Sequence, residues 1–584
     1  MKKNNAFRRA AALMAALSIT VSLAAPAFAD TYYIDYGDIT ITKNEDGSQT
    51  IEQGGDKWTD KAGEETVITT SNTVITTLES DLEGPAAEDS DFGPVVEDNY
   101  QSAQPESTEE SEDADQPEIA EEPKSADRQE SADQQAAPAA APAGSAPVNK
   151  KDDGFWGNTI TVINNIADKV LNLTLKDVKI DVSDTGDQYD WDQKGKAALS
   201  VQGKGNVEIE LDGDNELKSG TQSAGLEKTS TGTLTLKDDN NEAGSLTATG
   251  GFNSAGIGGG YLGDGKNITI TGGTVTATGG SSGAGIGGGR EGKGENITIT
   301  GGTVNATGNE DGAGIGGGSS GSGENITIND GKVTATGGSY AAGIGGGSVG
   351  AWGGDAGSGK NITINGGTVN ATGTDGGAGI GGGENGNGED ITINGGKVNA
   401  SGAYGGAGIG GGVNGIGSKV TVNGAAQVTA TATGSGPDWS GVGTGATIGN
   451  GGSKTPDGPV DGKEIQADIS GLTTGYIHHI IYNPDLDSDG KPDGILKEWW
   501  EFALPKPIPD GESLDLHVET LKGAPLLFNT RQQGSTLWVT TDNLSARLHG
   551  TRQALETLQE QGVEQIEFVT TLKTTTLSVE DLLT

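Results

Sequence analysis

The stretch "GKNITITGGTVTATGGSSGAGIGGG", residues 265–289, contains three short runs in which apolar and polar side chains alternate. Alternation with a period of two is typical of β-strands that bury one face. Glycine pairs separate the runs and mark bends of the chain. The side chains that we expect to point inward are Ile268 and Ile270, Val275 and Ala277, and Ala284 and Ile286. This stretch therefore predicts one unit of three short strands.

The hexapeptide AGIGGG that ends this stretch recurs along the chain. Its copies begin at Ala255, Ala284, Ala313, Ala342, Ala378 and Ala407. The steps between copies are 29 residues, except one of 36 that contains a seven-residue insertion around "VGAWGGDAG". Stacked repeats tolerate such insertions because each unit touches only its neighbours. Three strands in each 29-residue unit predict an all-β fold, a parallel β-helix with coils about 4.8 Å apart.

The four glycines of each AGIGGG copy have two interpretations. Glycine permits positive φ and close backbone approach, which favours a tight corner of the coil. Stacked copies could instead form a smooth strip suited to a flat partner. We favour the corner.

The composition of the 584-residue chain restricts its class and its partners. The chain contains 102 glycines and no cysteine, so it does not depend on disulfides. Hydrophobic residues make up 32% and aromatic residues 4%, which argues against one large globular core. The formal net charge of −45 repels nucleic acid and anionic membranes and favours divalent cations. We therefore expect no nucleic-acid partner.

Residues 1–29 have the organisation of a secretory signal peptide. Basic residues at positions 2, 3, 8 and 9 precede an apolar run, and Ala27-Phe28-Ala29 matches a signal peptidase site. We expect this segment to be cleaved and the protein to be extracellular or at the cell surface. No second apolar run is long enough to span a bilayer, so we expect no membrane insertion.

The rest of the chain divides into four parts. Residues 30–80 contain alternating β-branched residues and predict an N-terminal β segment that caps the helix. Residues 81–153 are rich in Pro, Ala, Ser and acids and predict a disordered acidic linker, either a solvated spacer or a docking tail. Residues 154–455 contain the strands of the β-helix. Residues 456–584 lack the repeat and predict a small α/β domain.

The predicted α/β domain combines strands with one helix. The runs "SLDLHVETL", "STLWVTT" and "QIEFVTT" alternate as strands. The run "NLSARLHGTRQALETLQEQG" predicts a helix with Leu548, Leu555 and Leu558 on one side and Gly562 as its stop. The domain suits partner docking and a simple cap or spacer equally well.

The predicted strands that precede the regular repeats resemble those of a known family. The segments "AALSVQGKGNVEIELDGDNELKSG" and "AGLEKTSTGTLTLKDDNNEAGSLTATGG", followed by the GAGIGGG units, resemble secreted bacterial carbohydrate-binding-domain proteins. The resemblance covers about residues 156–450 and implies a right-handed, pectate-lyase-like parallel β-helix. It also implies binding of plant-type polysaccharide and calcium. Any calcium ligands carried over would be Asp212, Asp214 and Asp238 at most.

A calcium loop is the sharpest metal motif, and it lies outside the repeats in "DLDSDGKPDG". Carboxylates occupy positions 1, 3, 5 and 9 of the loop, and a glycine occupies position 6. Position 12 is a leucine, so a plain acidic turn is the alternative. His478-His479 is not expected to bind metal, because neighbouring strand side chains face opposite ways. The residues expected to bind calcium are Asp485, Asp487, Asp489 and Asp493.

Aromatic residues beside the repeats are the candidate ligand-binding residues. Phe252, Tyr340 and Tyr404 shortly precede copies of AGIGGG, and Trp352 lies on the insertion. Aromatic rings offer apolar platforms for sugars. The coil spacing places Tyr340 and Tyr404 about 10 Å apart. Isolated surface aromatics are the alternative for each residue taken singly.

These observations favour a secreted, non-catalytic module that binds extracellular polysaccharide through the β-helix surface. One alternative is a structural or adhesive surface protein that binds cell-surface proteins or itself. A calcium-dependent polysaccharide lyase needs a base and a cation, and the coils contain only scattered bases such as Arg290, Lys332 and Lys397. Outward threonines such as Thr274 and Thr276 resemble ice-binding arrays, although half-buried strands favour threonine in any case.

Overall fold

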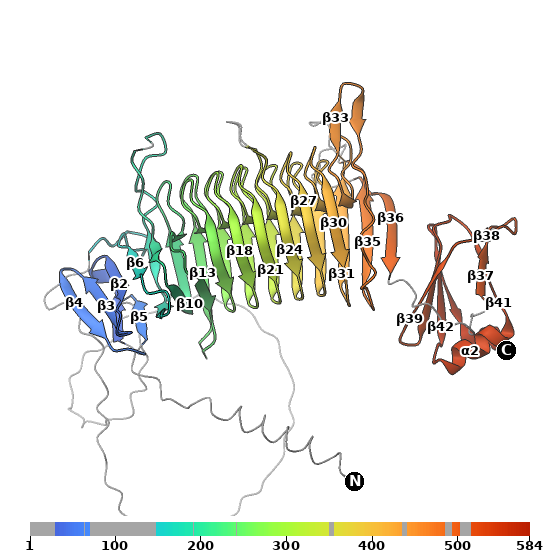
Figure 1. Cartoon of the computed structure of the whole chain (residues 1–584), viewed down its shortest axis with the longest axis horizontal. Helices are drawn as coiled ribbons and strands as arrows, with labels where there is room; N and C mark the ends of the chain where they lie inside the picture. The colour runs from blue at the N-terminus through green and yellow to red at the C-terminus, as the bar shows by residue number, and fades with distance from the viewer. Residues whose placement is uncertain are drawn as a thin grey trace, which may run out of the picture. The chain divides into compact units, whose positions relative to one another are not determined.

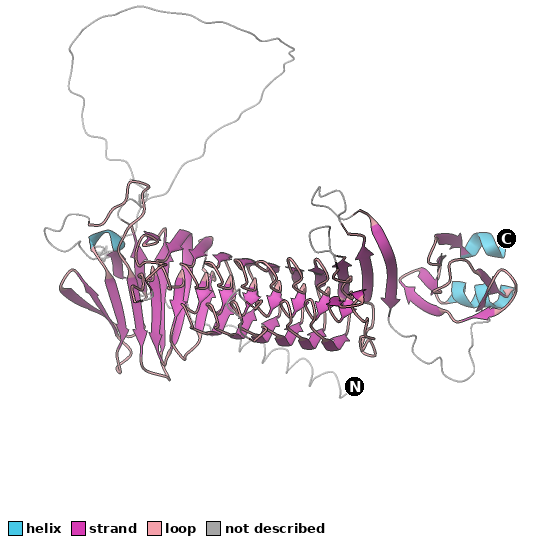
Figure 2. Cartoon of the chain, turned by 90° about the horizontal axis from the view of Figure 1, so that it is seen from above, coloured by secondary structure: helices cyan, strands magenta, loops and turns pink. Residues whose placement is uncertain are grey.

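The computed structural model describes residues 30–63, 65–70, 148–190, 192–240, 242–349, 355–434, 441–484, 493–502 and 516–584. Over most of these residues the chain winds as a stack of coils built from short strands (Figure 1, Figure 2). Each strand of a coil pairs in parallel with the equivalent strand of the next coil. The predicted parallel β-helix is confirmed.

One coil shows how the sequence makes each turn of the helix. Its strands are β15 (Gly265–Ile270), β16 (Thr274–Thr278) and β17 (Ile286–Gly287). Ile268 pairs with Ile297, one period later, and the other inward positions follow the same rule. The repeat of the sequence is therefore the repeat of the structure.

Three ladders of parallel strands run along the stack. The first contains β7 (Val170–Lys176), β10 (Asn206–Lys218), β12 (Leu234–Lys237), β15, β18 (Gly294–Ile299), β21 (Gly323–Ile328), β24 (Gly359–Ile364), β27 (Gly388–Ile393) and β30 (Gly417–Val422). The second contains β8 (Lys179–Asp181), the far end of β10, β13 (Gly244–Thr249), β16, β19 (Thr303–Thr307), β22 (Lys332–Thr336), β25 (Thr368–Thr372), β28 (Lys397–Gly402) and β31 (Gln427–Thr433). The third contains β2 (Ile39–Lys43), β6 (Ile160–Asn164), β9 (Leu199–Gly203), β11 (Leu226–Lys228), β14 (Ile257–Gly258), β17, β20 (Ile315–Gly316), β23 (Ile344–Gly345), β26 (Ile380–Gly381), β29 (Ile409–Gly410) and β32 (Ile448–Gly449).

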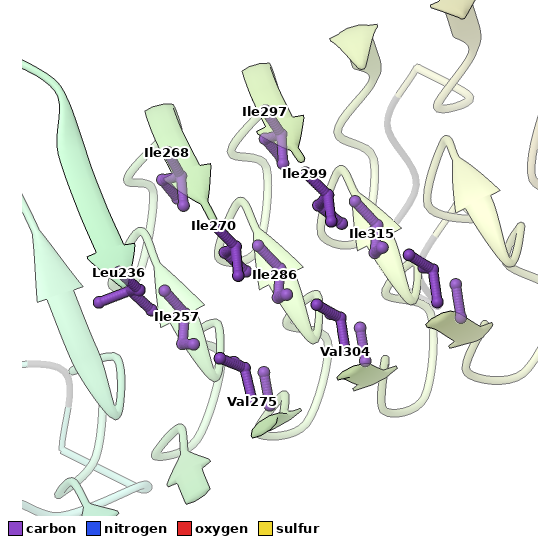
Figure 3. Close-up of a cluster of buried hydrophobic side chains, with 14 of the residues drawn as sticks. Leu236, Ile257, Ile268, Ile270, Val275, Ile286, Ile297, Ile299, Val304 and Ile315 are labelled. Atoms are coloured by element: carbon purple, nitrogen blue, oxygen red, sulfur yellow. The ribbon is translucent and has the colours of Figure 1, made fainter. Parts of the chain in front are cut away.

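The core of the β-helix is a set of stacked aliphatic side chains. Figure 3 shows Ile268, Ile270 and Ile286 in one coil with their counterparts in the next. All six inward positions predicted for this coil are 0% exposed. Asparagine ladders outside the core also follow the stack, since the Asn296 amide donates to Asn267 at 3.0 Å. Like residues therefore pack on like residues in successive coils.

The N-terminal residues build the first coil of the same stack. β1 (Asp30–Tyr33) pairs with β5 (Thr66–Thr69), β5 pairs with β7, and β2 pairs with β6, all in parallel. The short helix η1 (Ile34–Tyr36) joins β1 to β2, and the antiparallel strands β3 (Gln49–Gln53) and β4 (Asp56–Asp60) extend the third ladder. The buried Asp60 carboxylate accepts a hydrogen bond from Tyr32 at 2.6 Å.

The C-terminal end of the β-helix lies further along the chain than the boundary predicted at residue 455. β33 (Ser453–Thr455) and β34 (Gly458–Val460) form a small antiparallel pair. β35 (Tyr476–Tyr482) then pairs in parallel with β31, and β36 (Ile495–Phe502) pairs antiparallel with β35. These two strands lack the repeat, which is why the sequence assigns them to the α/β domain. Their pairing instead continues the second ladder.

The C-terminal domain combines strands with two helices around its own core, which includes Val539, Leu558 and Ile566. Its elements are β37 (Leu516–Glu519), β38 (Pro525–Leu526), β39 (Asn529–Gln533), β40 (Thr536–Thr540), β41 (Arg547–Gly550), α2 (Arg552–Glu560), β42 (Gln565–Val569), β43 (Thr574–Ser578) and α3 (Val579–Leu583). The three predicted strand runs each contain a strand.

The predicted helix of this domain is shorter than expected. Leu548 lies in β41, opposite Val518, and not on the helix. α2 begins after Thr551, whose side chain accepts a hydrogen bond from the amide of Ala554 at 3.1 Å. This N-cap satisfies an amide that has no partner within the helix and fixes its start.

Several predicted features lie outside the described residues. They are the signal peptide 1–29, residues 81–147 of the acidic linker, Trp352, and three calcium-loop carboxylates, Asp485, Asp487 and Asp489. Within the described part of the chain, no helix has the length and apolar character needed to cross a membrane.

Candidate functional site

The glycines of each AGIGGG copy form a buried corner of the coil. All six residues of every copy are buried. Gly287 has a φ of 136°, and a Cβ atom there would overlap the carbonyl oxygen of Gly316 in the next coil. Glycine alone combines this conformation with so close a backbone approach. The corner interpretation is therefore right, and the copies do not form an exposed strip.

Two turns flank the corner, and backbone hydrogen bonds join them across neighbouring coils. The residue after one copy donates its amide hydrogen to the turn residue before the preceding copy. The amide of Glu384 donates to the carbonyl oxygen of Tyr340 at 2.7 Å, and the amide of Ser348 donates to that of Asp311 at 2.8 Å. These bonds bring turn positions that are distant in sequence side by side.

Three residues on these turns, Asp311, Tyr340 and Glu384, form what we call the Tyr340 corner. All three are half-buried. Burial raises the pKa of Asp311 to about 6, and the like charges of Glu310 and Glu384 add to this while Arg290 opposes it. Burial also raises the pKa of Glu384, and burial and the surrounding carboxylates raise that of Tyr340. The corner therefore concentrates carboxyl groups around one aromatic ring.

The Tyr340 corner has the chemistry of a site for a polyhydroxylated ligand. Its ring offers an apolar face, and its carboxylates accept hydrogen bonds from hydroxyl groups. The glycine corner beneath holds the backbone in one conformation. The sequence predicts Tyr340 as a site residue but misses Asp311 and Glu384. Their signal in the sequence is an acid just before or just after a copy of AGIGGG.

The other predicted aromatic residues occupy the same turn in other coils. Phe252 and Tyr404 are half-buried. Tyr340 and Tyr404 both have positive φ, 65° and 48°, so both lie in the left-handed region of this turn. Tyr404 follows Tyr340 by two coils, or about 10 Å, and Phe252 precedes it by three. The structure thus brings Tyr340 and Tyr404 to one edge of the helix.

Carboxylates are not gathered into a metal site in the described part of the chain. No group of three or more His, Cys, Asp or Glu residues there is placed to hold a metal ion. Asp493 of the predicted calcium loop immediately precedes Gly494 and β36. Asp212 accepts from an asparagine amide at 2.6 Å, Asp214 pairs with Lys179 at 2.8 Å, and Asp238 accepts a backbone N–H at 3.2 Å. These last three carboxylates therefore already have protein partners.

The outward residues of the ladders form two kinds of threonine row. Along the second ladder, Thr303 and Thr368 alternate in register with Lys332 and Lys397, so lysines interrupt the row that begins at Thr274. The first ladder carries an uninterrupted row that sequence reasoning missed. Its members are Thr235, Thr269, Thr298, Thr327, Thr363, Thr392 and Thr421. The lysines and Arg290 lie on different edges of the coil and do not converge.

His478 and His479 face opposite sides of β35, as expected for neighbours in a strand. His478 stacks on Trp500 with ring centroids 3.7 Å apart, and His479 stacks on Trp499 at 4.4 Å. The Nδ1 atom of His479 lies 2.6 Å from the hydroxyl of Thr447. Burial lowers the pKa of His479 to about 3, so this ring is neutral at physiological pH. The two rings therefore serve packing.

One known family model matches this chain, and it matches in the coils. The family model of the beta helix repeat matches residues 242–261, 268–290, 297–319, 326–348, 362–384 and 391–413. Each of the last five segments begins at the first inward isoleucine of a coil and ends with the residue after AGIGGG. No curated protein and no solved structure matches the chain. The chain therefore contains beta helix repeats stacked as a parallel β-helix.

Proposed function

We propose that this protein is a secreted, non-catalytic binding module for extracellular polysaccharide. The observation that carries the proposal is the Tyr340 corner, a half-buried tyrosine next to the buried glycine corner and close enough to Asp311 and Glu384 for their charges to add to burial in raising its pKa. The ring would pack against the C–H face of a sugar, and Asp311 and Glu384 would accept its hydroxyl hydrogens. Tyr404 would serve a second sugar about 10 Å along the same edge.

The charge of the protein favours uncharged sugars. The chain has a formal net charge of −45, and the Tyr340 corner is itself acidic. Like charges across an interface oppose binding. A uronate polymer, the substrate of the lyase alternative, would therefore bind less well than a neutral polysaccharide.

Affinity electrophoresis on a panel of neutral and uronate polysaccharides tests this function. We expect retention by neutral polymers, and Tyr340→Ala should weaken it by about two- to tenfold, because one aromatic contact contributes about 0.5–1.5 kcal/mol. Tyr189→Ala is the control, since Tyr189 is 84% exposed on a loop away from the corner. Absence of retention by every polymer would contradict the proposal.

We also propose that the loop carrying Asp485, Asp487, Asp489 and Asp493 binds calcium. Alternate carboxylates with a glycine at the sixth position suit one hard cation. Calcium should raise the melting temperature of the protein relative to a chelator, and Asp487→Ala should remove the rise. Asp330→Ala, a change at an exposed carboxylate on a coil, is the control. Equal melting temperatures with and without calcium would refute calcium binding.

A structural or adhesive role is the second candidate function. The observation that favours it is the exposed strand β36 at the C-terminal end of the helix, where 60% of Leu496 is exposed.

A further inference from the structure

The last strand of the β-helix, β36, has one edge without a strand partner among the described residues. β36 pairs antiparallel with β35, from Tyr476 opposite Phe502 to Tyr482 opposite Ile495. Figure 1 shows β36 as the final strand at this end of the stack. The free edge of such a strand presents backbone N–H and C=O groups that can pair with another strand.

The side chains of β36 protect this edge only in part, through the charges of Lys497, Glu498 and Glu501 and through the contact of Phe502 with Trp538 of the C-terminal domain at 6.3 Å. Natural edges are blocked by proline, by runs of charge or by a covering element. In β36 the apolar side chains of Ile495, Leu496 and Trp500 are 51%, 60% and 40% exposed. Trp500 is held flat against the sheet by stacking on His478 at 3.7 Å and on Phe502 at 6.0 Å. The strand therefore exposes apolar side chains beside its charged ones.

The face of β36 that carries Lys497, Trp499 and Glu501 has charged groups without a full set of oppositely charged partners in the described part of the same chain. Glu501 lies 3.7 Å from His479, which is neutral, and accepts a hydrogen bond from Gln466 at 3.1 Å. Burial raises the pKa of Glu501, and the like charges of Glu464 and of Asp542 in the C-terminal domain add to it, while the hydrogen bond from Gln466 opposes it. Lys497 lies over the ring of Trp499 at 4.3 Å and forms no salt bridge within the described residues. A cation opposite Glu501 would therefore be favourable.

A second β36 strand supplies that cation. When two copies run antiparallel about Trp499, Lys497 of each copy stands opposite Glu501 of the other, and Glu498 stands opposite Trp500. Directly opposed residues share a face of the sheet, so the two ion pairs form on one face. Centring the pairing on Glu498 instead would place this carboxylate opposite itself. The register about Trp499 is the one in which Lys497 and Glu501 stand opposite each other, so the charges favour it.

We propose that two copies of this protein associate end to end by antiparallel pairing of their β36 strands about Trp499. The interface is isologous, since the same strand contributes from both copies. The occupant of the free edge is therefore a second copy of this chain, and its recognition rests on main-chain pairing plus two Lys497–Glu501 ion pairs. This inference does not depend on sugar binding.

Sedimentation velocity of the purified chain over a range of concentrations tests the association, and a dimer is expected. Lys497→Glu should weaken dimerisation by about tenfold, because it replaces two attractive cross-strand pairs by repulsive ones. Combining it with Glu501→Lys should restore the dimer. Lys419→Glu, a charge reversal at a lysine on a coil, is the control. A monomer at all concentrations, or a dimer indifferent to Lys497→Glu, overturns the proposal.

Introduced cysteines test the register directly, because the chain contains no natural cysteine. Trp499→Cys places two thiols opposite each other, within the Cα separation that a disulfide bridges. Lys497→Cys places them four residues out of register and should not cross-link. Efficient cross-linking through position 497 but not 499 would contradict the proposed register. Melting temperatures of all variants show whether the fold is retained.

Discussion

Asp311 makes the stability of the protein depend on pH. Burial raises its pKa from 3.8 to about 6. Between these values the folded protein holds a proton that the unfolded chain releases, so stability is present at low pH and lost as pH rises through the window. We expect Asp311→Asn, whose amide stays neutral, to show a smaller loss. Urea unfolding between about pH 4 and about pH 7 measures it.

Asp330→Asn is the control for this experiment, because Asp330 is an exposed carboxylate on a turn of a coil. Asp60 at the N-terminal end contributes to the same pH window, since burial raises its pKa to about 6 as well. Some pH dependence therefore remains in the Asp311→Asn variant. Identical pH profiles of the variant and the unmodified protein would show that Asp311 does not contribute.

Individual residues were predictable where the repeat defines their environment. The inward positions follow from alternation, and all six predicted in the quoted coil are fully buried. The carboxylates of the Tyr340 corner were missed for a physical reason. Glu384 meets Tyr340 through a backbone bond between different coils, and nothing in the local sequence shows which turns of neighbouring coils adjoin.

A whole coil should be removable without loss of the fold. Deletion of residues 294–322 takes out β18, β19 and β20 and joins the coil of β15 to that of β21. Gly265 and Gly323 both pair with Gly294, so the new neighbours are already in register. We expect strand content to persist and the melting temperature to fall by less than about 5 °C. Circular dichroism during heating measures both.

Deletion of residues 294–308 is the matched control, since it removes about half a coil. It removes β18 and β19, so that β17 is followed in the chain by β20, a strand of the same ladder, and the coil is left without its strands in the other two ladders. We expect this shorter deletion to abolish the cooperative transition. If both deletions behaved alike, coils would not be the units of stability.

Strands inside the 29-residue repeats could be predicted from the sequence, whereas the strands and the helix outside the repeats were predicted less well. The 29-residue repeat located three strands in every coil, and the structure has them. β35 and β36 belong to the β-helix, whereas the sequence predicts them in the C-terminal α/β domain, because these two strands do not carry the 29-residue repeat. The predicted helix was too long, because Leu548 fits a helical pattern but lies in a strand. The cap at Thr551 marked the true start.

At the scale of the whole β-helix, the two ends differ. The N-terminal end finishes on β4, an edge strand on which Asp56 and Lys57 are exposed. Charge on an edge discourages pairing with a further strand. The C-terminal end finishes on β36, which also carries charges but leaves Ile495, Leu496 and Trp500 exposed. Each molecule has one such pairing end, and in a dimer both of these ends are used. The proposed association therefore gives a dimer and not a filament.

The likeness of the coils also shapes how the chain must fold. A coil that pairs one unit too far along meets the same isoleucines and the same glycine corner, so the slipped pair makes the same local contacts as a native pair. Such mispaired states can form during folding and act as kinetic traps. The 36-residue step and the non-repeating strands at the two ends are the parts that differ. These non-repeating parts can each pair in one place only, and they therefore fix the register of the identical coils in the stack.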